Sequence, residues 1–123
     1  MDVPILKQED VLIATVQSAL TDADMLQLRS ELVQQVVRFR SRGVIVDVTS
    51  LDVMDSFASR MLRDIARMIR LRGAKMVIVG IQPEVAFAMV QLGLKLEDIA
   101  TALDLDEGLR LLNRELRSTD KRS

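Results

Sequence analysis

Hydroxyl and carboxylate side chains gather between residues 49 and 59, where the sequence is best equipped for chemistry. The cluster comprises Thr49, Ser50, Asp52, Asp55, Ser56 and Ser59. A serine at the start of a helix suits phosphorylation, because free backbone N–H groups and the positive end of the helix dipole favour a phosphate dianion. A phosphate on Ser56 would also lie beside Asp55, with Asp52 four residues earlier, and these charges oppose it. The attraction by the helix dipole and the repulsion by the carboxylates are each worth about 1 kcal/mol. Because a partner packed on this segment would have to desolvate the phosphate, a phosphorylation switch on Ser56 is physically reasonable, with Ser59 as the less favoured acceptor.

The same residues allow other interpretations. An Asp-Ser pair before a helix is typical of simple capping, in which the carboxylate accepts bonds from the first backbone N–H groups. Asp52 and Asp55 are also suitable metal ligands, but the sequence has no histidine and no coordinating loop pattern, so it does not indicate a metal site. Of the apolar residues that flank the serine, Phe57 is expected in the core, while Met54 fits either the core or an exposed anchor.

Composition excludes several functional classes for this chain of 123 residues. The absence of Cys and His removes thiolate nucleophiles, disulfides and the commonest general base near neutral pH. Three Phe, no Tyr, no Trp and a net charge of −1 do not suit a nucleic-acid binder. There is no secretory signal pattern, and no apolar run approaches the roughly 20 residues that span a bilayer. We therefore expect a soluble, cytoplasmic protein that is not an enzyme and binds no cofactor, metal, nucleic acid or membrane.

The apolar pattern predicts strands that alternate with helices. Runs at 3–6 and 11–17 flank a polar turn at 7–10 and predict a hairpin, and Pro4 favours an edge position for its first strand. Helical and β-branched patterns predict the remaining elements. We expect helices from Thr21 to the stop signal at 41–43, from Asp55 to Arg72, from Pro83 to Leu92 and from Asp104 to Leu116, with Phe39, Met68 and Leu92 on inner faces, and strands at 44–48, 76–79 and 96–100.

This order predicts an α/β fold with a mixed, mostly parallel sheet covered by about four helices. We expect a single domain over 1–123, ordered from about 3 to 116, with a polar C-terminal tail. The loops at 49–56 and 80–84 follow consecutive parallel strands, so they should lie side by side at the carboxyl edge of the sheet. The 80–84 loop lacks the glycine spacing of a nucleotide-binding loop. A stripe of arginines at 60, 63, 67 and 70 is either a solvated helix face or a docking face for an acidic partner.

The run Val44-Ile45-Val46-Asp47-Val48, followed by Met54-Asp55-Ser56, resembles the STAS domains of anti-sigma factor antagonists. That family carries Asp-Ser-Ser-Gly at this helix start, and a partner kinase phosphorylates the first serine. Here the motif reads Asp55-Ser56-Phe57-Ala58, without the second Ser and the Gly. With the segments Gly73-Ala74-Lys75, Gly80-Ile81-Gln82-Pro83 and Ala102-Leu103-Asp104-Leu105, it is similar to the RsbS type, the single-domain scaffolds of the bacterial stressosome. The similarity runs from about Val11 to Leu116.

The resemblance implies partners and a role in bacterial stress signalling. An RsbR-type STAS paralogue would co-assemble with the chain into a large particle, and an RsbT-type serine kinase would be held there. The kinase would phosphorylate Ser56 and leave, and an RsbX-type phosphatase would reset the system. Paralogues of the RsbR type usually have Thr at this position and an extra N-terminal sensor domain, so Ser56 favours the scaffold. Two alternatives stay open: an anti-sigma factor antagonist that acts without a particle, and a small-molecule-binding module that uses the same two loops.

Overall fold

The computed structural model describes residues 3–18, 20–93 and 99–122, and it contains one five-stranded sheet in the order β1-β2-β3-β4-β5. The strands are β1 (Ile5–Gln8), β2 (Val11–Thr15), β3 (Gly43–Asp47), β4 (Lys75–Val79) and β5 (Ala100–Ala102). The helices are α1 (Asp22–Phe39), α2 (Ser56–Leu71), α3 (Pro83–Gln91) and α4 (Leu105–Arg122). Only β1 pairs antiparallel, as the edge strand of a hairpin, and the other pairs are parallel. The predicted α/β architecture and the edge position of β1 are confirmed.

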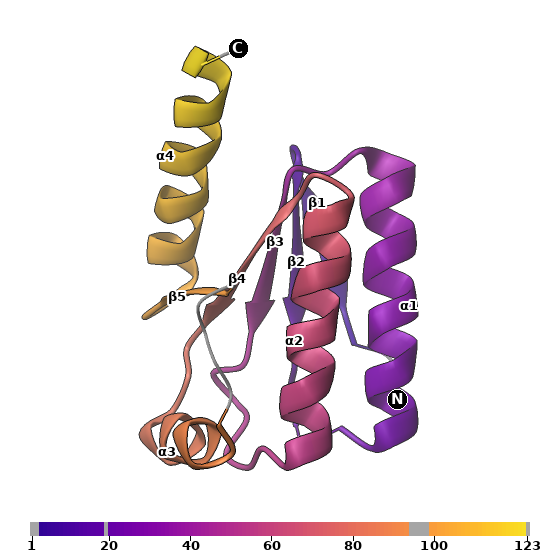
Figure 1. Ribbon diagram of the computed structural model, residues 1–123, viewed down its shortest axis with the longest axis vertical. Coiled ribbons are helices and arrows are strands. Elements are labelled where there is room, and N and C mark those ends of the chain that lie inside the picture. The colour runs from indigo at the N-terminus through magenta and orange to yellow at the C-terminus, as the bar shows by residue number, and fades with distance from the viewer. Residues whose placement is uncertain (1–2, 19, 94–98, 123) are drawn as a thin grey trace.

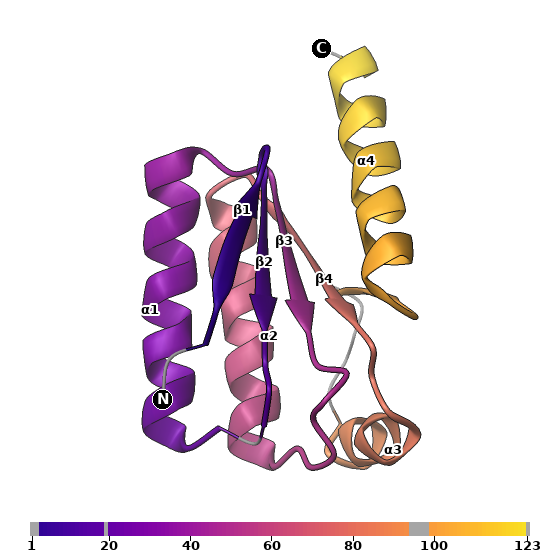
Figure 2. The same ribbon diagram turned by 180° about the vertical axis from the view of Figure 1, so that it is seen from behind.

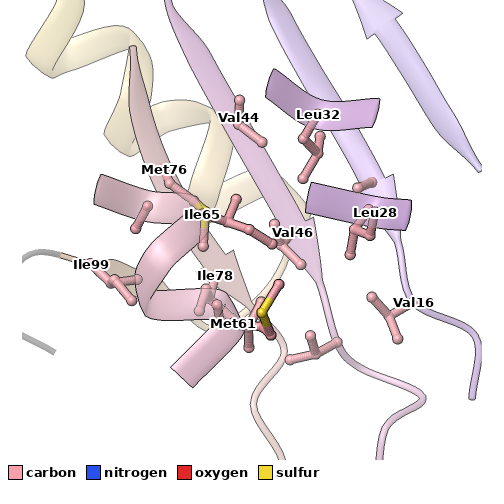
Figure 3. Packing of buried hydrophobic residues seen from close by; sticks show 14 of the residues in the cluster. Val16, Leu28, Leu32, Val44, Val46, Met61, Ile65, Met76, Ile78 and Ile99 are labelled. Atoms are coloured by element: carbon pink, nitrogen blue, oxygen red, sulfur yellow. The ribbon is translucent and has the colours of Figure 1, made fainter. Parts of the chain in front are cut away.

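The helices form two layers on the sheet and a cap at one end. Helices α1 and α2 cover one face, α4 covers the other, and α3 lies beyond the carboxyl ends of the strands (Figure 1, Figure 2). Alternation along the strands explains the two layers, because successive side chains point to opposite faces. Val44, Val46, Met76 and Ile78 pack under α1 and α2 (Figure 3), whereas Ile45, Val77 and Val79 pack with Leu112 of α4.

The helix starts match their sequence signals. At α1, Thr21 and Asp24 form a reciprocal capping box, in which the Asp24 N–H donates to Thr21 Oγ1 (3.1 Å) and the Thr21 N–H donates to Asp24 Oδ2 (3.2 Å). Pro83 is the first residue of α3. A backbone N–H at this position would have no intrahelical acceptor, so proline costs the helix no hydrogen bond. Each of these helices follows a strand, so each helix begins beyond the carboxyl edge of the sheet.

Several predicted boundaries are wrong. The β1–β2 turn is confined to Glu9 and Asp10, because Lys7 and Gln8 pair with β2. Strand β5 is Ala100–Ala102 rather than 96–100, of which 96–98 lie outside the described residues. Helix α4 runs to Arg122, so the expected tail continues the helix. The apolar periodicity of the sequence does not extend to Arg122, so it predicted a helix that is too short.

Three residues expected on inner faces are exposed instead. Phe39 is 38% exposed, Met68 37% and Leu92 44%. Phe39 is the last residue of α1, and the centre of its ring lies 5.2 Å from Arg38 Cζ and 5.8 Å from Lys7 Nζ. The two cations cover the ring in place of the core. Among the described residues, no helix has the length and apolar character needed to cross a bilayer.

Candidate functional site

The loops after β3 and β4 lie side by side, as the sequence predicts. The two strands pair in register with Asp47 opposite Val79, and the Val48 N–H donates to the Val79 carbonyl (3.0 Å). Beyond the strand ends, Gln82 Nε2 donates to the Thr49 carbonyl (2.7 Å). Gly80 has a φ of 77°, and a Cβ there would overlap Thr49 Oγ1. The approach of the two loops therefore depends on glycine at position 80.

Buried apolar side chains anchor the loop from 48 to 55. Val48, Leu51 and Met54 are buried, and the Leu51 N–H donates to the Val48 carbonyl (2.9 Å). Met54 is thus a core residue, which resolves the alternative that its sequence position left open. Phe57 is half-buried and packs against the same core. Between these anchors, Ser50, Asp52 and Val53 are exposed, so the loop is held from below and presents polar groups above.

Asp55 caps α2 with its side chain. Its backbone is extended (φ −90°, ψ 176°), and its Oδ1 accepts a bond from the Ala58 N–H (2.8 Å). The Ser59 N–H donates to the Asp55 carbonyl (3.1 Å). Ser56 is the first helical residue and is exposed, and the first N–H groups of a helix have no intrahelical acceptor. The capping interpretation is confirmed for Asp55, and it leaves the Ser56 hydroxyl uninvolved.

The hydroxyls near the loop have different environments. Thr49 Oγ1 donates to Asp47 Oδ1 (2.6 Å), which also accepts from the Thr49 N–H (2.9 Å). Ser59 is only 2% exposed, and its hydroxyl has no hydrogen-bond partner among the described residues. Ser50 and Ser56 are exposed. Of the hydroxyls at the start of α2, Ser56 is therefore the one that a bulky partner can reach.

Two residues of this arrangement were missed by the sequence reasoning. Asp47 holds the turn after β3 through its bonds to Thr49. An Asp that bonds to the backbone two residues later is a recognised turn pattern, so the Asp47-Val48-Thr49 segment carried a usable signal. Gln82 joins the two loops, and no local pattern indicates that role.

An apolar cavity of about 60 Å³ lies below the loop, between α1 and α2. Val16, Met25, Leu28 and Leu62 contribute to its walls, with Asp55 at its margin. An engineered apolar cavity that binds benzene measures about 150 Å³, so this smaller cavity does not hold a nucleotide. The described residues contain no group of three or more His, Cys, Asp or Glu side chains that could hold a metal ion.

The arginines of α2 do not form one uniform stripe. Arg60, Arg67 and Arg70 are exposed, whereas Arg63 is half-buried and its Nε lies 3.8 Å from Asp64 Oδ1. At this distance and exposure, an ion pair contributes little to stability. Arg60 lies one helical turn beyond Ser56, and the other three arginines lie further along α2.

The fold and this loop arrangement define the class of the protein. The STAS domain model matches residues 2–108, so the chain belongs to the STAS domain family. The structure of SpoIIAA, an anti-sigma factor antagonist, in its unphosphorylated form shares the fold with a TM-score of 0.75 at 13% identity, and covers 90% of this chain and 96% of that one.

Three other relatives are more similar to this chain in sequence. A serine-to-glutamate variant of RsbS from Moorella thermoacetica is 35% identical, with a TM-score of 0.84 over 94% of this chain and 97% of that one. A chain from the stressosome, described as a signal integration and transduction hub, is also 35% identical, with a TM-score of 0.79 over 93% of this chain and 99% of that one. The RsbT co-antagonist protein RsbRA of Bacillus subtilis is 32% identical over 84 residues, which are 68% of this chain and 31% of that protein. The chain thus spans less than a third of RsbRA. The resemblance to STAS domains of the RsbS type is confirmed.

Proposed function

We propose that this chain is a non-enzymatic scaffold of a bacterial stressosome, which sequesters a serine/threonine switch kinase and releases it when Ser56 is phosphorylated. In this proposal the chain acts in the cytoplasm as a single STAS domain over 1–123. Its relatives support the assignment, because two similar chains are an RsbS variant and a component of the stressosome itself.

The exposure of Ser56 at the first position of α2 carries the proposal. The other candidate acceptors are less suitable, since the Thr49 hydroxyl is bonded to Asp47 and Ser59 is buried. Because Asp55 already caps the helix, phosphorylation of Ser56 breaks no bond that holds α2 in place. The substrate serine can therefore be modified without unfolding the helix start.

The added charge explains how modification changes binding. The positive end of α2 favours the phosphate, while exposed Asp55 and Asp52 oppose it, and each effect is worth about 1 kcal/mol. These effects nearly cancel in the free chain. A kinase packed over the loop would have to desolvate a phosphate of charge −1.5 to −2, which disfavours the complex much more strongly.

The proposed partners follow from the relatives' names and from the family resemblance. RsbRA is named an RsbT co-antagonist, which supports an RsbR-type STAS paralogue as co-scaffold and an RsbT-type kinase as the sequestered enzyme. An RsbX-type phosphatase would remove the phosphate from Ser56. The chain itself supplies the acceptor and no catalytic group.

Phosphate mapping tests the site. The chain is incubated with its RsbT-type kinase and ATP and then mapped by mass spectrometry. We expect one phosphate, on Ser56, which disappears in Ser56→Ala and persists in the matched control Ser50→Ala, whose hydroxyl is also exposed. A phosphate on Ser50 or Ser59 that persists in Ser56→Ala would contradict the assignment.

A further inference from the structure

The charges of this chain are sorted by the ends of the sheet. The strand-to-helix connections and the first helical turns that follow them cover 16–25, 48–59, 80–86 and 103–108, and they contain no Lys or Arg. All of them lie at the carboxyl edge of the sheet, the end at which α3 lies in Figure 1. The exposed carboxylates of this acidic edge are Asp22, Asp52, Asp55, Glu84, Asp104 and Asp106.

The opposite end of the sheet has the opposite charge. The helix-to-strand connections that follow α1 and α2, at 38–42 and 70–75, contain no carboxylate. The cations of this basic edge are Arg38, Arg40, Arg42, Arg70, Arg72 and Lys75. Helix α4 reaches the same end, because Arg42 Nη2 donates to the Leu116 carbonyl (3.3 Å) and Lys75 pairs with Glu115, so exposed Arg117 lies close by. The hairpin turn adds Glu9 and Asp10 beside β2.

The fold explains why the charges add up. An acidic residue at a helix start and a basic residue at a helix end each interact favourably with that helix's own dipole. In successive parallel βα units the crossing helices run back against the strands. The starts of α1, α2 and α4 therefore lie at one edge and their ends at the other, whereas α3 lies beyond the carboxyl edge (Figure 1). A net charge of −1 therefore conceals two oppositely charged poles.

Cations of the basic edge are available for a partner. Arg40, Arg72 and Arg117 are exposed, and their side chains make no ion pair with the part of the chain that the structure describes. Arg40 also has a φ of 50°, a backbone conformation that suits Gly or Asn better than Arg at a helix C-terminus. The helix end does not need arginine at this position. Arg40→Gly therefore removes a docking cation while it keeps a residue that suits the backbone conformation.

We propose that the basic edge of one copy of this chain docks the acidic edge of another, so that copies associate end to end. Charge complementarity identifies the second copy as the occupant, because the acidic edge has the required sign and its sequence segments contain no cation. Such a contact is heterologous, and each copy keeps one free edge, so the association can extend into a ring or a larger assembly. Ser56 belongs to the acidic edge, so a second copy and the kinase compete for this edge, and the phosphate strengthens the contact between copies while it weakens kinase binding. This deepens the proposed function by naming the surfaces of self-association.

Sedimentation velocity of the chain alone tests the contact. At 20 mM NaCl we expect concentration-dependent association that weakens about tenfold at 500 mM NaCl, because salt screens exposed charges over distances beyond a few ångströms. Two double variants should each stay monomeric: Arg40→Glu/Arg72→Glu, which reverses the basic edge, and Asp52→Lys/Glu84→Lys, which reverses the acidic edge. A mixture of the two variants should associate again. Arg40→Gly should weaken association without loss of thermal stability. The control Arg29→Glu/Arg110→Glu reverses charges within helices and should associate like wild type.

Ser56→Asp adds negative charge at the position of the proposed phosphate, and it should raise association at 20 mM NaCl. The matched control Ser30→Asp adds the same charge in the middle of α1 and should not raise association. A chain that is monomeric at all salt concentrations, or that associates more strongly at high salt, would overturn the proposal, and so would a mixture of the two reversed variants that stays monomeric. Association only with an unrelated acidic protein would overturn the assignment of the second copy. No kinase is present, so failure here is distinguishable from failure of the Ser56 switch.

Discussion

Ser56 and Ser59 lie one helical turn apart in α2, and only Ser56 exposes its hydroxyl. The difference follows from the helix period, since Ser59 falls on the face that also buries Leu62 and Ala66. A phosphate on Ser59 would have to fit into this buried face, where the residue is only 2% exposed. Solvent exposure therefore distinguishes Ser56 from Ser59, although the two serines are only three residues apart in the sequence.

Removal of the α2 cap should destabilise the protein. Asp55→Ala deletes the carboxylate that accepts the Ala58 N–H, and we expect a loss of about 1 kcal/mol in the free energy of unfolding. Urea denaturation followed by circular dichroism measures it. Asp55→Asn keeps a capping oxygen and should lose much less. Equal stability of Asp55→Ala and wild type would show that the cap contributes nothing.

Individual residues were predictable from sequence where their role is local. The cap at Asp55 and the box at Thr21 rest on neighbours within a few positions, and both are confirmed. The bond from Gln82 to Thr49 joins residues 33 positions apart, and it depends on strand adjacency that a local pattern does not contain. The exposure of Phe39 was missed for a related reason, since helical spacing does not show whether the last residue of a helix still contacts the core.

At the scale of elements, the two loops of the site are held together by the close approach of Gly80 and Thr49. Gly80→Ala should destabilise the chain by more than 2 kcal/mol, because a Cβ there overlaps Thr49 Oγ1 and lies 3.0 Å from Thr49 Cα, in addition to the left-handed backbone penalty of about 1 kcal/mol. Chemical denaturation measures both this variant and its control.

Gly73→Ala is the matched control for that substitution. Gly73 has a similar φ of 84°, but a Cβ there meets nothing within 4 Å. It should lose only the backbone penalty, about 1 kcal/mol. If the two variants were equally destabilised, packing between the loops would not hold the site.

The elements themselves were largely predictable. Strands and helices occur in the predicted order, because apolar periodicity reports which face each element buries. The ends of β5 and α4 were not predictable, since pairing of Ala100–Ala102 with β4 and the continuation of α4 to Arg122 have no apolar signature.

At the scale of the whole molecule, the proposed scaffold should form a particle with its partner. Mixed with an RsbR-type paralogue, the chain should elute from gel filtration with light scattering as a megadalton assembly. The alternative, an anti-sigma factor antagonist that acts without a particle, should give only small complexes. The sequence lists the charged residues, but their segregation to two edges emerges only when the parallel strands align the helices.

Kinase release is the most direct test of the Ser56 switch. The chain is immobilised, loaded with its RsbT-type kinase, and exposed to ATP while the bound kinase is followed by interferometry. We predict that ATP releases the kinase from wild type and not from Ser56→Ala, which should fold and bind normally, and that Ser56→Asp binds the kinase more weakly than Ser50→Asp. Release from Ser56→Ala at the wild-type rate, or equal kinase affinity of Ser56→Ala and Ser56→Asp, would contradict a switch at Ser56.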